Sequence, residues 1–162
     1  MIRMANLQDY GEIIKLYNKN SKELGRYFKS DIVEKITSNQ WYLDVENDKI
    51  VAFCSYTIKK RLKRIVIEYL CVDKEYRHNH KATNLIQRIM DDTSSMGLPY
   101  YAECLSGLEN NSFYDKVAKL VDVRERPTYK ILIYQFGGKN QWTTKDVNKK
   151  DAIALRVIME SV

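Results

Sequence analysis

One carboxylate stands alone in a strongly apolar stretch of the chain. Residues 65–72 are almost all aliphatic, β-branched or aromatic, a pattern typical of a buried central strand, and Glu68 is the single charge among them. Burial disfavours the charged form of a carboxylate, which suits a general base that works through a water molecule. An ion pair with a neighbouring Arg or Lys, or exposure where the sheet opens, would explain Glu68 equally well.

A basic loop follows this strand directly and leads into a helix. The apolar residues of the predicted helix share one face at helical spacing, and Gly97 is placed to end it; they are Ala82, Leu85, Ile86, Ile89 and Met90. The first N–H groups of a helix have no intrahelical partner, and the helix dipole favours negative charge there. The loop therefore predicts an anion site, built from Tyr76, Arg77, His78, Asn79, His80 and Lys81.

Hydrophobic periodicity and turn residues divide the rest of the chain into short elements. Asn6 can cap a first helix, and Asp31 with Glu34 resembles a capping box for a second. We predict strands over residues 2–4, 41–45, 50–58, 65–72, 99–104 and 129–136, with helices starting near residues 6, 31, 81 and 112. Consecutive hairpins are antiparallel and a strand–helix–strand crossover is parallel, so we expect a mixed α/β fold.

The length of 162 residues predicts one domain, over residues 1–138, followed by an extension over residues 139–162. That extension can form an amphipathic helix, with an apolar side made of Ala152, Leu155, Ile158, Met159 and Val162. The helix and the last strands are possible surfaces for a homodimer. The N-terminus has no apolar signal-peptide core and no apolar run is long enough to cross a membrane, so we expect a cytoplasmic protein without a membrane partner.

A net charge of +6 and a pI near 9.1 suit a phosphorylated ligand, nucleic acid, or simple solubility. The densest basic cluster is a predicted hairpin tip, which is either a solvated turn or a contact to a nucleic acid backbone; it contains Lys59, Lys60, Arg61, Lys63 and Arg64. The three cysteines, Cys54, Cys71 and Cys104, fall in strand-like segments and are expected to be buried, free thiols. His78 and His80 have no third ligand at a telling spacing, so we expect no metal.

Two motifs resemble the GNAT superfamily of acetyl-CoA-dependent N-acetyltransferases. The first is Leu70-Cys71-Val72-Asp73 followed by Glu75-Tyr76-Arg77, then Ala82 and the aliphatic pair Leu85-Ile86. The second, Ser112-Phe113-Tyr114-Asp115-Lys116, is similar to an FYxK segment that precedes the last strands of the family. The resemblance covers roughly residues 1–136 and implies a mixed, mostly antiparallel central sheet flanked by helices.

The resemblance also implies a binding mode for acetyl-CoA as co-substrate. The pantetheine arm would pair with the backbone of Leu70, Cys71 and Val72, and Arg77 would belong to the phosphate loop. The pyrophosphate would meet backbone N–H groups of His78, Asn79, His80, Lys81, Ala82 and Thr83. Asn110 and Asn111 can bind pantetheine, although either can also cap a helix. His80 stands where the family has its first glycine, which lets a phosphate approach the backbone without a Cβ in the way.

The resemblance therefore implies acetyl transfer to an amine by direct attack, with Glu68 as the base. Tyr114 lies about 100° around its helix from Phe113, off the predicted core stripe of Phe113, Val117 and Leu120, so its hydroxyl can act as the acid. Two alternatives stay open. One is a GNAT-fold enzyme that modifies a nucleic acid base, held through the basic hairpin tip. The other is a non-catalytic binding or regulatory protein whose phosphate loop has degenerated at His80.

Overall fold

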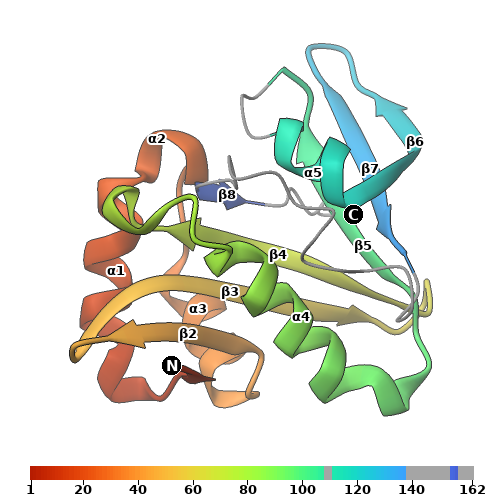
Figure 1. Cartoon of the computed structure of the whole chain (residues 1–162). Coiled ribbons are helices and arrows are strands. Elements are labelled where there is room, and N and C mark those ends of the chain that lie inside the picture. The colour runs from red at the N-terminus through yellow and green to blue at the C-terminus, as the bar shows by residue number, and fades with distance from the viewer. Residues whose placement is uncertain (108–110, 138–153, 157–162) are drawn as a thin grey trace.

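The computed structural model describes residues 1–107, 111–137 and 154–156, which form a mixed sheet flanked by helices (Figure 1). The strands follow the order β1-β2-β3-β4-β5-β7-β6, and β8 pairs with β4 beside this path. Of these pairs only β4 and β5 are parallel, which confirms the mixed, mostly antiparallel sheet. The strands are β1 (Ile2–Met4), β2 (Trp41–Glu46), β3 (Lys49–Lys59), β4 (Arg64–Val72), β5 (Tyr100–Leu105), β6 (Ala118–Glu125), β7 (Lys130–Phe136) and β8 (Ala154–Arg156).

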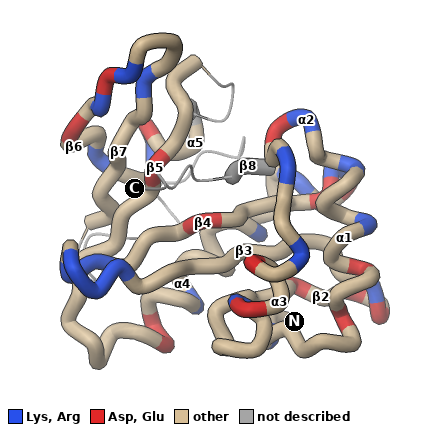
Figure 2. Tube along the Cα trace, turned by 180° about the vertical axis from the view of Figure 1, so that it is seen from behind, with Lys and Arg blue, Asp and Glu red and all other residues tan. Residues whose placement is uncertain are grey.

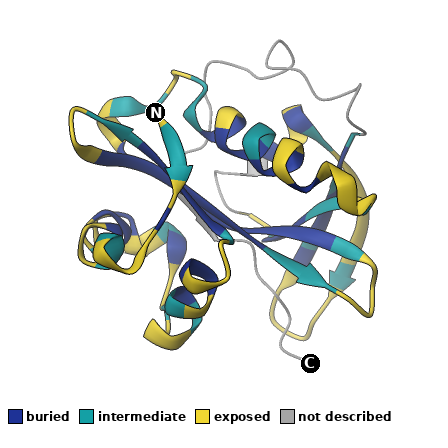
Figure 3. Ribbon diagram, turned by 90° about the horizontal axis from the view of Figure 1, so that it is seen from below, coloured by how far each residue is buried: buried dark blue, intermediate teal, exposed yellow. Residues whose placement is uncertain are grey.

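The α-helices lie on both faces of the sheet, whose central strands are buried between them (Figure 3). They are α1 (Tyr10–Lys19), α2 (Ser21–Leu24), α3 (Lys29–Thr37), α4 (Lys81–Thr93) and α5 (Asn111–Val117). Residues of α1 and α3 join one apolar cluster, and residues of α4 and α5 join another. Neighbouring strand residues alternate between the two, as Phe53 and Cys54 do on β3, because side chains of a strand point to opposite faces.

A β-bulge interrupts the pairing of β3 with β4 at the middle of the sheet. Cys54 pairs with Leu70 and Tyr56 pairs with Ile67, so Ser55 lies opposite two residues of β4, Glu68 and Tyr69. The Ser55 hydroxyl accepts a hydrogen bond from the Tyr69 N–H at 3.2 Å. The bulge breaks the strict alternation of β4, and the side chains of Glu68 and Tyr69 both reach residues of α3.

The two parallel strands β4 and β5 separate along their length. Residues 65–67 of β4 pair with residues 100–102 of β5, and the described part of the chain shows no pairing between these strands beyond that point. From there on, residues 69–71 of β4 pair with β8 instead. The second half of β4 therefore has an edge that β5 does not cover.

Several local predictions are confirmed. Asn6 caps a turn of 3-10 helix (Leu7–Asp9) that leads into α1, and Asp9 completes a capping box. The β2–β3 hairpin turns at Asn47 and Asp48, which both have positive φ angles, as a two-residue turn of this kind requires. Gly97 follows the turn of 3-10 helix (Ser94–Met96) after α4 and is left-handed, with a φ of 64°.

Three predictions about secondary structure are wrong. The strand β6 was missed, because its residues are mostly exposed and show no apolar alternation; Leu120, expected on the helix, lies exposed on this strand. The second helix begins at Lys29 and not at Asp31, whose carboxylate binds Lys35 and the Tyr69 hydroxyl and caps nothing. We also expected a loop over residues 18–29, between the first two predicted helices, and this segment contains the short helix α2.

The predicted C-terminal helix is contradicted where the structure describes it. Residues 154–156 form the strand β8, because the uncovered edge of β4 offers backbone partners that an amphipathic pattern alone does not reveal. The other residues expected on the apolar side of that helix lie outside the described residues; they are Ala152, Ile158, Met159 and Val162.

Candidate functional site

The loop between β4 and α4 keeps a left-handed backbone without any glycine. A turn of 3-10 helix (Lys74–Tyr76), capped by the Asp73 carboxylate, leads into it. His78 has a φ of 67°, and His80, the N-cap of α4, has a φ of 58° and a ψ of 21°. Such a conformation costs a side-chain-bearing residue about 1 kcal/mol. The backbone at His80 thus has the shape that glycine favours, while the Cβ atom stays in place.

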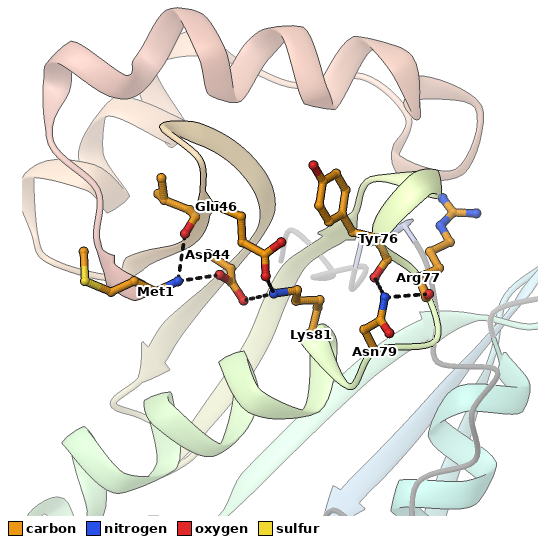
Figure 4. Close-up of polar contacts among 8 residues, drawn as sticks. Met1, Asp44, Glu46, Tyr76, Arg77, Asn79 and Lys81 are labelled. Carbon is orange, nitrogen blue, oxygen red and sulfur yellow. Dashed lines mark hydrogen bonds and ion pairs between the residues drawn. The ribbon is translucent and has the colours of Figure 1, made fainter.

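The cationic side chains of this loop bind to other parts of the protein (Figure 4). Arg77 donates from Nε to the Val72 carbonyl and from Nη2 to Asn20 Oδ1, both at 3.0 Å. Asn20 is buried between α1 and α2, so Arg77 fastens the end of β4 to these helices. The Asn79 side chain braces the loop from within by donating to the carbonyls of Tyr76 and Arg77.

Lys81 points in another direction from Arg77. Its ammonium lies 3.3 Å from Asp44 Oδ2 and also binds Glu46, both on β2, and Asp44 binds the terminal ammonium of Met1 at 3.1 Å (Figure 4). Arg77 and Lys81, both expected in the anion site, thus each bind a protein partner in the structure. Any anion at this helix would depend chiefly on the backbone N–H groups of residues 78–83 and the helix dipole.

Glu68 is held in a buried ion pair. Its side chain is 6% exposed, and Oε2 lies 3.0 Å from the Lys35 ammonium, which is 3.0 Å from Asp31 Oδ1. The Tyr69 hydroxyl donates to the second oxygen of Asp31 at 2.7 Å. Burial alone would lower the pKa of Lys35, but Glu68 and Asp31 outweigh burial and raise it above its usual value. Glu68 therefore forms an ion pair with a lysine, which is one of the alternatives that its sequence context left open.

Lys35 is a residue that sequence reasoning missed. It lies three residues after Ile32 and one before Ile36, on the side of α3 that faces the core, and it is buried with them. A lysine within an apolar stripe is a signal for a buried partner, because an unpaired ammonium is costly to bury. That signal could have paired Lys35 with Glu68, the one charge of the central strand.

Tyr114 is fully buried, and among the described residues its hydroxyl has no hydrogen-bond partner. Its ring stacks on that of Tyr134 with a centroid distance of 5.5 Å, and the rings of Phe113 and Phe136 meet it edge-on. Burial raises the pKa of Tyr114 well above its usual value, with a smaller contribution from Cys104. The prediction that Tyr114 lies off the core stripe is wrong, since α5 is a short helix of seven residues whose Tyr114 packs on Tyr134 and Phe136 of β7.

The apolar cluster that contains Tyr114 shows on which face of the sheet this side chain lies. After burial, the groups that raise the pKa of its hydroxyl are Cys104 on β5, Cys54 on β3 and Tyr134 on β7. Cys54 is the direct partner of Leu70 on β4. Tyr114 thus lies in the apolar cluster on the α4 and α5 face of the sheet, whereas Glu68 contacts α3 on the opposite face.

The structure describes all of the remaining predicted cofactor residues except Asn110. Leu70, Cys71 and Val72 lie on the uncovered half of β4, and Ala82 and Thr83 are buried in the first turn of α4. Asn111 is the first residue of α5, and Asn110 lies outside the described residues. All three cysteines are free and buried as predicted, and burial raises the pKa of each thiol.

The basic hairpin tip is only partly available to a ligand. Lys59 lies 3.2 Å from the buried carboxylate of Glu103, and the Arg64 guanidinium lies 4.1 Å from the centre of the Tyr101 ring. Lys60, Arg61 and Lys63 are exposed at the tip, where Figure 2 shows Lys and Arg gathered. The nucleic acid hypothesis thus stays a prediction that rests on these three residues.

Two further features bear on the class of site. Within residues 1–107, 111–137 and 154–156, no cluster of three His, Cys, Asp or Glu side chains could hold a metal ion. The helices in the same part of the chain include none that is long and apolar enough to cross a membrane.

The sequence matches the acetyltransferase (GNAT) family over residues 8–118, which is most of the chain. The protein therefore belongs to the GNAT family of acetyltransferases, as its motifs predicted. No curated protein matches the sequence.

Solved structures of acetyltransferases share the fold. Arabidopsis thaliana Naa50, in complex with the bisubstrate analogue CoA-Ac-MVNAL, aligns with a TM-score of 0.68 and 17% identity over 85% of this chain and 97% of its own. N-acetylglutamate synthase from Neisseria gonorrhoeae, complexed with coenzyme A and N-acetyl-glutamate, aligns with a TM-score of 0.69 and 15% identity. The alignment covers 85% of this chain but only 35% of the synthase. PaiA N-acetyltransferase from Thermoplasma acidophilum, in complex with coenzyme A, aligns with a TM-score of 0.64 and 13% identity over 84% of this chain and 98% of its own.

Proposed function

We propose that this protein transfers the acetyl group of acetyl-CoA to an amine by direct attack. The observation that carries the proposal is the Tyr114 hydroxyl, which is buried in the apolar cluster on the α4 and α5 face of the sheet without a partner in the described structure. A buried hydroxyl without a hydrogen bond lowers stability by about 1–3 kcal/mol, and a bound ligand that accepts this hydrogen bond would remove the cost. Family membership and the coenzyme A complexes of the similar structures support the choice of ligand.

The backbone supplies most of the proposed cofactor contacts. Residues 70–72 of β4 offer peptide groups to the two amides of the pantetheine arm, in the manner of a neighbouring strand. Residues 78–83 offer backbone N–H groups and the positive end of α4 to the pyrophosphate. Asn111, the first residue of α5, and Asn110, which precedes it in the sequence, are proposed to bind the pantetheine as well.

Two side chains are proposed to move protons. Glu68 accepts a proton from the incoming ammonium through a water, so that the neutral amine can attack the thioester carbonyl. Collapse of the tetrahedral intermediate then breaks the C–S bond, Tyr114 donates its proton to the departing sulfur, and the extra proton on the new amide nitrogen returns to Tyr114. Burial raises the pKa of Tyr114, so the hydroxyl holds its proton until the thiolate forms. Lys35 stays protonated beside Glu68 and acts as a fixed positive charge.

The substrate class of the acceptor is proposed only as an amine. The similar structures contain acceptors as different as a peptide analogue and an amino acid product, and a likeness at 15–17% identity shows the fold alone. A panel of acceptors is therefore part of the test, with free amino acids, short peptides and polyamines as its three arms.

The experiment mixes the full-length protein with acetyl-CoA and each acceptor and follows acetylated product by mass spectrometry. Transfer to at least one amine, together with saturable binding of acetyl-CoA by calorimetry, is the expected result. Binding without transfer to any arm would contradict the amine assignment. A protein that binds no acetyl-CoA at millimolar concentration would contradict the proposal and favour the non-catalytic alternative, in which His80 has ended cofactor binding.

A further inference from the structure

The second half of β4 is paired on both edges. β3 pairs with one edge, and β8 covers the other, where residues 69–71 lie opposite residues 154–156 in antiparallel register (Figure 1). This is the edge that β5 leaves when it separates from β4 after Ile67. A strand from the end of the chain therefore lies in the opening between the two parallel strands.

Acetyl-CoA would need the same edge. Its phosphates are proposed to meet the start of α4, which follows β4 after a short loop, and its thioester is proposed to meet Tyr114, which lies near Cys54. Cys54 is the β3 partner of Leu70, and Leu70 is also the β4 partner of Leu155. A ligand that joins these two points runs along the residues that β8 now covers.

We propose that β8 is a built-in competitor of acetyl-CoA, which must leave β4 before the pantetheine arm can pair with residues 69–72. The inference rests on the proposed use of acetyl-CoA. A backbone N–H or carbonyl on β4 can serve β8 or the pantetheine amides but not both, because each has one partner position on that edge. The C-terminal strand thereby makes cofactor binding depend on a conformational equilibrium of the chain itself.

The size of the effect follows from the fraction of molecules with β8 released. The apparent dissociation constant equals the intrinsic constant divided by that fraction, so a strand that is released in one molecule in ten weakens binding about tenfold. A partner or modification that removes β8 from β4 would raise the affinity for acetyl-CoA by the same factor.

The release variant is Leu155→Pro in the full-length chain. Proline removes a backbone N–H and disfavours strand pairing, whereas Leu155→Val keeps the N–H and suits a strand, so it is the matched control. Calorimetric titration with acetyl-CoA should give a dissociation constant about tenfold lower for Leu155→Pro than for the wild type, with Leu155→Val unchanged.

The locking variant uses a cysteine that the protein already has. Cys71 lies directly opposite Ala154, and directly opposite residues on antiparallel strands are close enough for a disulfide. Ala154→Cys, refolded from urea with diamide as oxidant so that burial of Cys71 does not limit the reaction, should lose two hydrogens by intact mass and lose acetyl-CoA binding. Dithiothreitol should restore the binding. The variant Ala154→Ser, which adds a side chain of similar size but cannot form the cross-link, controls for the new side chain and should bind in both conditions.

The outcomes separate this inference from the proposed function. Equal affinity of wild type and Leu155→Pro, full binding by the cross-linked variant, or no cross-link on refolding would each overturn the role of β8 and leave the acetyl-CoA site standing. Absence of binding by the wild type and by Leu155→Pro alike would overturn the proposed function, and the inference with it.

Discussion

Glu68 and Tyr114 lie on opposite faces of the sheet, and their surroundings differ in kind. Glu68 is fastened by Lys35, which Asp31 and Tyr69 hold in turn. Tyr114 is packed among aromatic rings, and the described residues offer its hydroxyl nothing to bind. A carboxylate held in a buried ion pair is suited to hold the fold together, whereas a buried hydroxyl without a partner is suited to meet a ligand. The difference makes Tyr114 the stronger of the two catalytic candidates.

The largest effect is expected on stability, from Glu68→Gln. Removing one partner of a buried ion pair leaves Lys35 without its closest buried counter-charge, and we expect the free energy of unfolding to fall by about 3 kcal/mol in urea denaturation. The double variant Glu68→Gln/Lys35→Met should recover most of that loss, since no unpaired charge remains.

The same double variant separates the two roles of Glu68. A stable double variant that transfers acetyl about a hundredfold more slowly would assign proton transfer to Glu68, and one with the wild-type rate would assign it structure alone. Unchanged stability of Glu68→Gln would break the comparison, because the ion pair would then contribute nothing.

Tyr114→Phe should lower the rate of acetyl transfer about a hundredfold and leave acetyl-CoA affinity unchanged. Stability should stay the same or rise by about 1 kcal/mol, because the variant removes a buried hydroxyl that lacks a partner. The matched control is Tyr134→Phe in the ring stacked on Tyr114. Its hydroxyl donates to Asp115 at 2.8 Å, so this variant should lose about 1 kcal/mol of stability and keep its rate. The reverse pattern would contradict the assignment.

A pH titration probes the buried neutral groups around Tyr114. Burial raises the pKa of the Cys54 thiol, so the unfolded chain loses this proton near pH 9 while the folded chain keeps it. Stability is thus unaffected below about pH 8 and falls above pH 9, by about 1.4 kcal/mol per pH unit for each such thiol. Urea denaturation between pH 7 and pH 10 measures how the free energy of unfolding changes with pH. Cys54→Ala should make this slope above pH 9 less steep by about 1.4 kcal/mol per pH unit, the contribution of one thiol. An identical slope in that variant would show that Cys54 is ionised in the folded protein.

The smallest effect is expected at the phosphate loop. Both His78 and His80 have left-handed backbones, so His78→Gly and His80→Gly should each relieve about 1 kcal/mol of backbone strain. Glycine also gives the unfolded chain more conformational freedom, which offsets part of this gain in stability. Only His80 occupies the N-cap of α4, where a Cβ would meet the pyrophosphate. His80→Gly alone should therefore raise acetyl-CoA affinity several-fold in calorimetric titration. Equal gains in both variants would attribute the effect to backbone strain and not to access.

The parts of the fold that follow from local pattern were predictable. The apolar run of β4, the amphipathic stripe of α4 and the two-residue turn at Asn47 and Asp48 each carry their own signal. The strand β6 carries none, because an edge strand with exposed side chains lacks alternation. The strand β8 exists only because β4 and β5 separate, which is a property of the sheet and not of residues 154–156.

The candidate site divides in the same way. Sequence motifs located Glu68, Tyr114 and the loop at His80, since each lies within a segment of recognisable pattern. They could not reveal that Arg77 binds Asn20 or that Lys81 binds Asp44, because these partners lie far away in sequence and meet only in the folded sheet. Long-range pairs of this kind decide which charges remain for a ligand, and in this loop both Arg77 and Lys81 already have protein partners.

The most direct test of the account is a crystal structure of the full-length protein with acetyl-CoA. The account predicts the pantetheine arm along residues 70–72 in place of β8, with the thioester sulfur within hydrogen-bonding distance of the Tyr114 hydroxyl. Acetyl-CoA bound elsewhere, with its sulfur remote from Tyr114, would contradict it.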